Sequence, residues 1–241
     1  MRRILFSALL LSFGVVAFAQ TDTSRNSRLL SPMSVPSSDH FLIQFGGATW
    51  QNKPDSVSTG GFSRTFNMYV MLDFPFKTNP HFSVALGPGL GTDHIFLDKQ
   101  IADIKGTTTS IRFTRLADSA YFDKFKVSTA FLEIPVELRF TANPEASGKS
   151  FKIALGAKVG TMLAAWTKGK ELMNKSGNTV NDYLSKEKSK RYFNTTRIAA
   201  TARVGYGHFT LFGTYALTPL FKEGVGPKMN TLSLGLTLSG L

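Results

Sequence analysis

Apolar and polar residues alternate strictly along the stretch AFLEIPVELRF, residues 130–140. Every second position is apolar, and Glu133, Pro135, Glu137 and Arg139 lie between the apolar positions. This alternation predicts a β-strand with two unlike faces, because successive side chains point to opposite sides of a strand. Proline donates no ladder hydrogen bond, so we expect an irregularity in strand pairing at Pro135.

Seven other stretches show a similar alternation. Each supplies about the 9–11 residues that a tilted strand needs to cross a bilayer. Together with the first stretch they predict eight strands, at residues 40–50, 64–76, 82–97, 130–140, 151–166, 197–206, 209–218 and 231–241.

The connections between these strands alternate in length. The short joins are KTNP, TANPEASGKS and Gly207-His208, which are rich in turn-forming residues. The longer joins are residues 51–63, 98–126, 167–196 and 219–228. Such alternation is typical of an outer-membrane barrel, in which turns and both termini lie in the periplasm and long loops lie outside the cell.

Aromatic residues gather at the turn end of the apolar faces. A ring of aromatics at one level indicates a girdle at a membrane interface, whereas a sandwich core would spread them along the strands. The girdle would consist of Phe41, Phe74, Phe76, Phe82, Phe140, Phe151 and Phe209, with Tyr206 close by.

The polar faces carry acids and bases that would line the interior of such a barrel. Eight strands enclose only enough space for side chains, so we expect a packed ionic interior and no open pore. Buried charges need partners, and Glu137 lies on a strand next to that of Lys152 and Lys158. The predicted interior network is Asp73, Glu133, Glu137, Arg139, Lys152, Lys158, Arg197 and Arg203. Two alternatives keep the apolar faces inside: a soluble sandwich and a soluble barrel of lipocalin type.

The N-terminus predicts export. Arg2 and Arg3 precede an apolar run and Ala17-Phe18-Ala19, the pattern of a cleaved signal peptide. The run is too short for a membrane-spanning helix. We therefore expect a signal peptide at 1–19, a flexible periplasmic lead-in at 20–39 and the barrel at 40–241. The predicted fold class is all-β: an eight-stranded antiparallel up-and-down transmembrane β-barrel.

The composition narrows the possible partners. The chain has no cysteine, which excludes disulfides, thiolate metal sites and a lipid-modified cysteine. Its formal net charge is +12. Because an exported chain rarely meets nucleic acid, we expect its partners to be outer-membrane lipid and lipopolysaccharide phosphates. The basic stretch 168–191 is predicted to be a solvated, mobile loop, with Lys186, Lys188 and Lys190 as candidate phosphate contacts.

Motifs for catalysis or cofactor binding are weak. GPGLG at 87–91 lacks the strand–loop–helix context and the lysine of a phosphate loop. The histidines are scattered without metal-site spacing, and no GxSxG motif occurs. We expect no cofactor, no metal and no enzymatic activity. A surface hydrolase using His94, Asp93 and Asp98 near the outer rim remains an alternative.

Two stretches resemble a known family. KVSTAFLEIPVELRF with FKIALGAKVG, and the ending LTPLFKEGVGPKMNTLSLGLTLSGL, are similar to outer-membrane β-barrel domain proteins common in Bacteroidota, including the PorT-like group. The resemblance implies an integral outer-membrane barrel of a Gram-negative bacterium. Some PorT-like members take part in type IX secretion and gliding.

The expected role is therefore structural or interaction-based. The alternatives are a component of a secretion or assembly apparatus that docks envelope proteins, a small-solute channel, and the hydrolase described above.

Overall fold

The computed structural model describes residues 40–116, 121–174 and 176–240. The predicted signal peptide and periplasmic lead-in lie outside the described residues. The described chain is built from β-strands, with a short 3₁₀ helix, η2 (Pro144–Lys149), in one turn. The strands are β1 (Phe41–Gln51), β2 (Arg64–Val70), β3 (Leu72–Pro75), β4 (Phe82–Leu86), β5 (Gly89–Leu97), β6 (Gln100–Asp103), β7 (Arg112–Arg115), β8 (Tyr121–Thr141), β9 (Phe151–Met173), β10 (Thr179–Lys188), β11 (Thr196–Tyr206), β12 (Phe209–Ala216) and β13 (Asn230–Ser239).

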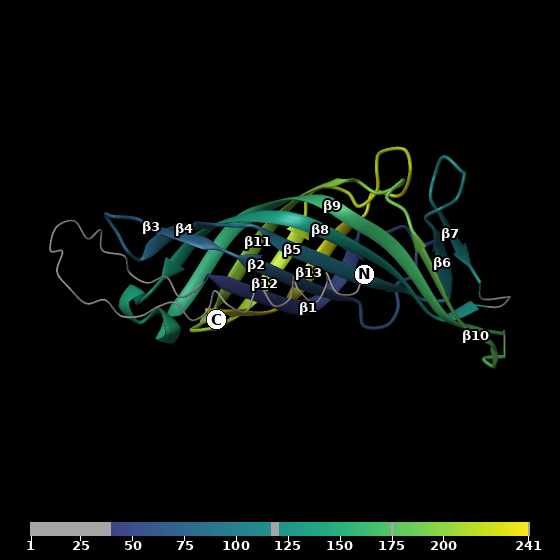
Figure 1. The fold of residues 1–241 in the computed structure, drawn as a ribbon, viewed down its shortest axis with the longest axis horizontal. Coiled ribbons are helices and arrows are strands. Elements are labelled where there is room, and N and C mark those ends of the chain that lie inside the picture. Colours follow the sequence, from purple (N-terminus) through teal and green to yellow (C-terminus); the bar gives the residue numbers. More distant parts are fainter. Residues whose placement is uncertain (1–39, 117–120, 175, 241) are drawn as a thin grey trace, which may run out of the picture. The chain divides into compact units, whose positions relative to one another are not determined.

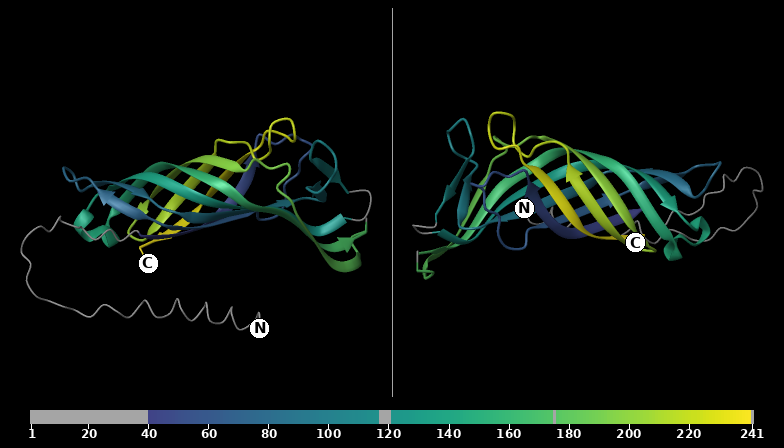
Figure 2. Two further views of the ribbon diagram at one scale, coloured as in Figure 1. Left: turned by 45° about the horizontal axis from the view of Figure 1, so that its top comes forward. Right: turned by 180° about the vertical axis from the view of Figure 1, so that it is seen from behind.

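Eight of these strands pair into a closed ring (Figures 1 and 2). The order is β1, β2, β5, β8, β9, β11, β12 and β13, and every pair is antiparallel. β13 then pairs with β1, from Leu42 opposite Ser239 to Gln51 opposite Asn230. The prediction of an all-β, antiparallel fold is confirmed.

Two of the predicted strands are divided. Residues 64–76 form β2 and β3, and residues 82–97 form β4 and β5. β4 and β5 both pair with β8, but Ile134 and Pro135 have no partner on that side. On the other side Pro135 pairs regularly with Lys158 of β9. The irregularity expected at Pro135 therefore occurs on one side only.

The strands on the long-loop side extend further than predicted. β8 and β9 run well past the apolar stretches, and β9 continues into a hairpin with β10 (Figure 1). Much of the stretch 168–191, predicted as a solvated loop, is thus strand, although β10 is mostly exposed to solvent as expected. Residues 179–184 of β10 are all exposed, so water contacts both faces of this strand and its residues need no alternation of apolar and polar side chains, the pattern from which strands are predicted. A second unpredicted hairpin, β6–β7, lies in the connection between β5 and β8.

The apolar faces point outward and the ionic faces inward. Ile134 and Leu236 are 53% and 58% exposed, whereas Glu137 and Arg203 are 3% and 5% exposed. Arg197 of β11 also reaches Asp93 of β5, and these strands are not neighbours in the ring, so the contact crosses the interior. The two soluble alternatives require the opposite orientation and are wrong.

The predicted girdle residues lie on the outward side near the short turns. Phe74, Phe76, Phe82, Phe151 and Phe209 are exposed, as is Tyr206, and Phe41 and Phe140 are partly exposed. Phe82 and Phe140 also contact each other across neighbouring strands, with ring centroids 5.2 Å apart.

An apolar core fills the long-loop end of the ring. Inward residues such as Ile95, Phe131 and Met162 pack there against buried loop residues. Several loops contact one another above this core: Tyr192 Oη donates to the carbonyl oxygen of Gly106 at 2.7 Å, and the Phe193 and Phe221 rings are 5.1 Å apart. The sequence analysis expected polar pairs to close the interior and did not anticipate this core.

Candidate functional site

The inward faces of the ring carry charged side chains beside glycines. Glu133 of β8 and Arg197 of β11 both lie opposite Gly160 of β9. Glu133 also lies opposite Gly89 of β5. Glycine leaves free volume above its backbone, so two long side chains on either side meet across it. A Cβ at Gly160 would lie 2.9 Å from Cγ of Glu133. Glycines on one strand thus lie opposite charged residues on the next, and the space left by their missing side chains holds the ion pairs.

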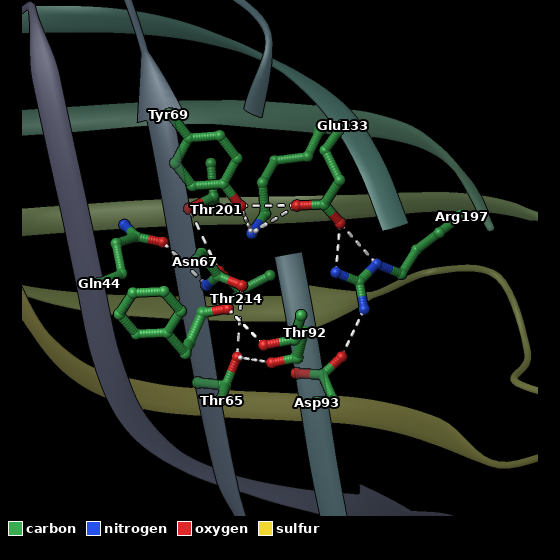
Figure 3. Close-up of polar contacts among 12 residues, drawn as sticks. Gln44, Thr65, Asn67, Tyr69, Thr92, Asp93, Glu133, Arg197, Thr201 and Thr214 are labelled. Atoms are coloured by element: carbon green, nitrogen blue, oxygen red, sulfur yellow. Dashed lines mark hydrogen bonds and ion pairs between the residues drawn. The ribbon is translucent and has the colours of Figure 1, made fainter. Parts of the chain in front are cut away.

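The first interior cluster is centred on Glu133 (Figure 3). Arg197 Nε donates to Glu133 Oε1 at 2.8 Å, and Arg197 Nη2 donates to the same oxygen. Tyr69 Oη donates to Glu133 Oε2 at 2.6 Å, and Lys158 Nζ lies 3.6 Å from that oxygen. Lys158 Nζ also donates to Tyr69 Oη at 3.0 Å. Both carboxylate oxygens of Glu133 are therefore satisfied by cationic or hydroxyl donors.

Asp93 is the second acid of this cluster. Arg197 Nη1 lies 2.5 Å from Asp93 Oδ2, so one guanidinium joins two carboxylates. The same guanidinium lies over the Phe131 ring, 4.1 Å from its centroid. The sequence predicts Asp93 near the outer rim and not among the interior residues. The strand alternation could have identified it, because Asp93 lies two residues after Gly91 in β5 and so points inward like Gly91.

A second interior cluster is centred on Glu137, nearer the short turns. Arg203 Nε and Nη2 donate to the two oxygens of Glu137, at 3.1 and 2.7 Å. Arg139 Nε donates to Glu137 at 3.1 Å, and its Nη1 lies 3.8 Å from Asp73. Lys152 is buried in the same part of the ring. The sequence predicts Glu137, Lys152 and Lys158 on neighbouring strands facing one interior, and all three are buried there. The two arginines, Arg139 and Arg203, are partners of Glu137 that the sequence did not single out.

The structure thus brings seven of the eight predicted interior residues into ion pairs with one another or with Asp93. They are Asp73, Glu133, Glu137, Arg139, Lys158, Arg197 and Arg203. Lys152, the eighth predicted residue, is also buried, with 7% of its surface exposed, and it too has an interaction partner. Tyr69 is the other participant that sequence reasoning missed, although it lies on the polar face of its strand.

Amides and hydroxyls line the opposite wall of the ring. Asn67 Nδ2 donates to Gln44 Oε1 at 3.1 Å, and Gln44 Nε2 donates to Thr237 Oγ1 at 3.2 Å. Thr65 Oγ1 donates to the carbonyl oxygen of Thr92 at 3.2 Å (Figure 3). These contacts link β13, β1, β2 and β5 inside the ring.

The cavities beside the Glu133 cluster are small. A cavity bounded by Asp93, Lys158 and Arg197 measures about 10 Å³, and another beside Phe131 is equally small. A single water needs about 10–15 Å³. Each of these two cavities is therefore too small for a solute larger than water.

The candidate hydrolase residues do not converge. His94 faces outward, with Nδ1 2.8 Å from Ser128 Oγ, whereas Asp93 faces inward toward Arg197. In the part of the chain that the structure describes, no group of three histidine, aspartate or glutamate side chains is arranged to hold a metal ion. None of the helices in that part is long and apolar enough to cross a membrane.

Comparison with known proteins identifies one matching family. The model of the outer membrane protein beta-barrel domain family matches residues 18–222, which include all ring strands except β13. No curated protein matches the chain.

Proposed function

Because the chain belongs to the outer membrane protein beta-barrel domain family and is an integral outer-membrane protein, we propose that its ring is an eight-stranded transmembrane barrel of a Gram-negative outer membrane. Its role is structural or interaction-based, carried by its outer surfaces and loops. It conducts no solutes and catalyses no reaction.

The observation that carries this proposal is the filled interior. Two ionic clusters, centred on Glu133 and Glu137, occupy the middle of the ring, and an apolar core closes the long-loop end. Eight strands enclose only enough space for side chains. Solutes and ions therefore have no continuous path along the axis.

The outward surface has the dimensions of a membrane-spanning band. In β8 the outward positions from Phe140 to Ala130 carry only apolar side chains. Ten residues at about 3.3 Å each, tilted by about 40°, rise roughly 25 Å along the axis. This is about the height of the apolar band of an outer-membrane barrel.

Reconstitution tests the proposal. The mature chain, folded in detergent, is expected to run faster on gels before heating than after heating, as a closed barrel does. In planar bilayers it is expected to show no stable conductance steps, because the clusters block the axis. Regular open-channel steps of a defined size, carried by the heat-modifiable form, would overturn the closed-interior proposal.

A second candidate role is partner binding within an envelope assembly, including a secretion apparatus of the PorT-like type. It is favoured by β10, whose one partner strand among the described residues is β9. Val180, Tyr183 and Leu184 are exposed on this strand. A strand with a free edge and exposed apolar side chains offers a site for a further strand.

Purification in mild detergent separates the two roles. A stable complex of defined stoichiometry that is lost in a Val180→Asn/Leu184→Asn variant would support the assembly role. A lone barrel would support the structural role.

A further inference from the structure

Four basic side chains line the outward surface just beyond the apolar band. Lys126 of β8, Lys168 of β9 and Lys186 of β10 are direct register partners, in one row across three strands. Arg64 of β2 lies one row closer to the band and on the same outward side. Directly opposed like charges destabilise a sheet. The row is therefore a surface that an anion would stabilise.

Two of the four cations, Arg64 and Lys126, contact one aromatic ring. Phe96 lies opposite Lys126, and Nζ of Lys126 is 5.8 Å from the centroid of the Phe96 ring. The Arg64 guanidinium is 5.6 Å from the same centroid. Among the charged groups near Lys126, the strongest interactions come from Arg64 and Lys168, both of the same sign. Two positive groups therefore lie beside the Phe96 ring, and a third, Lys168, lies opposite Lys126 on the next strand.

Acidic side chains do not neutralise this cluster. Within the described residues no carboxylate forms an ion pair with Arg64, Lys126, Lys168 or Lys186. In the next row away from the membrane, by contrast, the lysines have acidic neighbours. There Lys124 and Lys170 are also register partners, but each has a neighbouring acid: Lys124 lies 3.5 Å from Asp123, and Lys170 lies 2.5 Å from Glu171.

The surroundings of the cluster fit an amphiphile. On the membrane side, the outward residues Phe66, Leu132 and Leu163 are exposed and apolar. On the other side, a hollow of about 680 Å³ opens beside Arg64 and Phe96, and its walls include Tyr121 and Phe122. A ligand with acyl chains, phosphate and sugar would meet an apolar surface, cations and aromatic rings in that order.

We propose that Arg64, Lys126, Lys168 and Lys186 form a binding site for a phosphorylated glycolipid of the outer leaflet. The proposal rests on the membrane-spanning role proposed above. It places the phosphate contact on outward strand positions, whereas the sequence analysis placed it on a mobile loop at Lys186, Lys188 and Lys190. Only Lys186 belongs to both.

The test compares two double variants of the mature, folded protein. Lys126→Gln/Lys168→Gln removes two cations of the site. Lys124→Gln/Lys170→Gln removes two cations from the same strands, one row further out, where acids already balance them. The probes are nanodiscs containing lipid A, nanodiscs containing its dephosphorylated form, and inorganic phosphate alone, with bound lipid quantified by native mass spectrometry.

A basic residue near an anionic surface contributes about fivefold in affinity, so the first variant is expected to bind lipid A about 25-fold more weakly than the wild type. The second variant is expected to stay within about threefold, and rising salt is expected to weaken wild-type binding. Wild-type affinity in the first variant, or equal binding of dephosphorylated lipid, would overturn the proposal. Full competition by millimolar inorganic phosphate would also overturn it, because the site would then bind free anions.

Gel mobility and conductance of the same samples keep the two proposals separate. If the wild type is heat-modifiable and non-conducting but does not prefer lipid A over the dephosphorylated form, only the lipid site fails. If the wild type does not form a closed, non-conducting barrel, the proposed function fails.

Discussion

At the scale of single residues, Glu133 holds the middle of the ring together. Its carboxylate accepts hydrogen bonds from Arg197 and Tyr69, and Lys158 lies 3.6 Å away. Each of these partners is buried. Buried charges are tolerated when they are paired, and removing one partner leaves the other without compensation. The stability of the interior is therefore concentrated in a few ionic side chains.

We predict that Glu133→Ala lowers the free energy of unfolding by about 3–5 kcal/mol, because Arg197 and Lys158 would remain buried with one acid, Asp93, between them. The measurement is urea unfolding of the protein in lipid vesicles. The control is Glu171→Ala, which removes the acid of a surface ion pair and is expected to leave the free energy of unfolding almost unchanged. Equal effects of the two substitutions would show that the interior pairs do not stabilise the fold.

Gly91 provides a second residue-scale prediction. A Cβ at this position would lie 2.8 Å from Glu133 Oε2 and 3.0 Å from Arg197 Nη2. Gly91→Ala is therefore expected to destabilise the protein by about 1–3 kcal/mol through overpacking. Gly47→Ala is the matched control, since the nearest atom to its new Cβ would be 3.8 Å away. Urea unfolding compares the stabilities of the two variants. Unchanged stability of Gly91→Ala would contradict the short distances from Gly91 to the Glu133 and Arg197 side chains.

At the scale of elements, strands are predicted correctly from the sequence where one face points outward with apolar side chains and the other points into the polar interior. The alternation in β8 and β13 predicted both the strands and the side on which Glu137 and Leu236 lie. It failed in the β9–β10 hairpin, because water on both faces removes the alternation. It also failed for the core at the long-loop end, because loop residues such as Ile104 and Ile111 are buried by contacts between distant segments and follow no local period.

The hairpin and the loops are expected to differ in their effect on stability. Replacing residues 171–183 with Asn-Gly would join Lys170 to Leu184, which are already register partners. We expect this deletion to lower stability by about 1 kcal/mol or less, because the removed residues are mostly exposed. Ile104→Ala, a single loop substitution at a fully buried position, is expected to lower it by about 2–5 kcal/mol. Urea unfolding of both variants checks the order, and the reverse order would contradict the role given to the loop core.

At the scale of the whole molecule, the ring has two unlike ends. The turns at 76–82 and 206–209 lie at one end, where β1 begins and β13 ends. The β6–β7 and β9–β10 hairpins lie at the other end (Figure 2). The proposed orientation places the first end in the periplasm and the second outside the cell.

The absence of native cysteine makes this orientation testable. A cysteine introduced by Ser176→Cys, in the β9–β10 connection, is expected to react with a membrane-impermeant maleimide on intact cells. One introduced by Thr78→Cys, in the β3–β4 turn, is expected to react only after the outer membrane is permeabilised. Both positions are exposed, so accessibility of the residue itself does not separate them. Labelling of Thr78→Cys on intact cells would show that the orientation is the reverse of the one proposed.

The contact between β1 and β13 joins the two ends of the described chain, with Gly46 opposite Gly235. Until these strands meet, an open sheet placed in the bilayer would turn Glu133 and Arg197 toward acyl chains, where unsatisfied polar groups and charges are expensive. Strands therefore cannot enter the membrane one by one. β1 and β13 must therefore pair as the chain inserts, and a chain truncated before β13 would not be stable in the membrane.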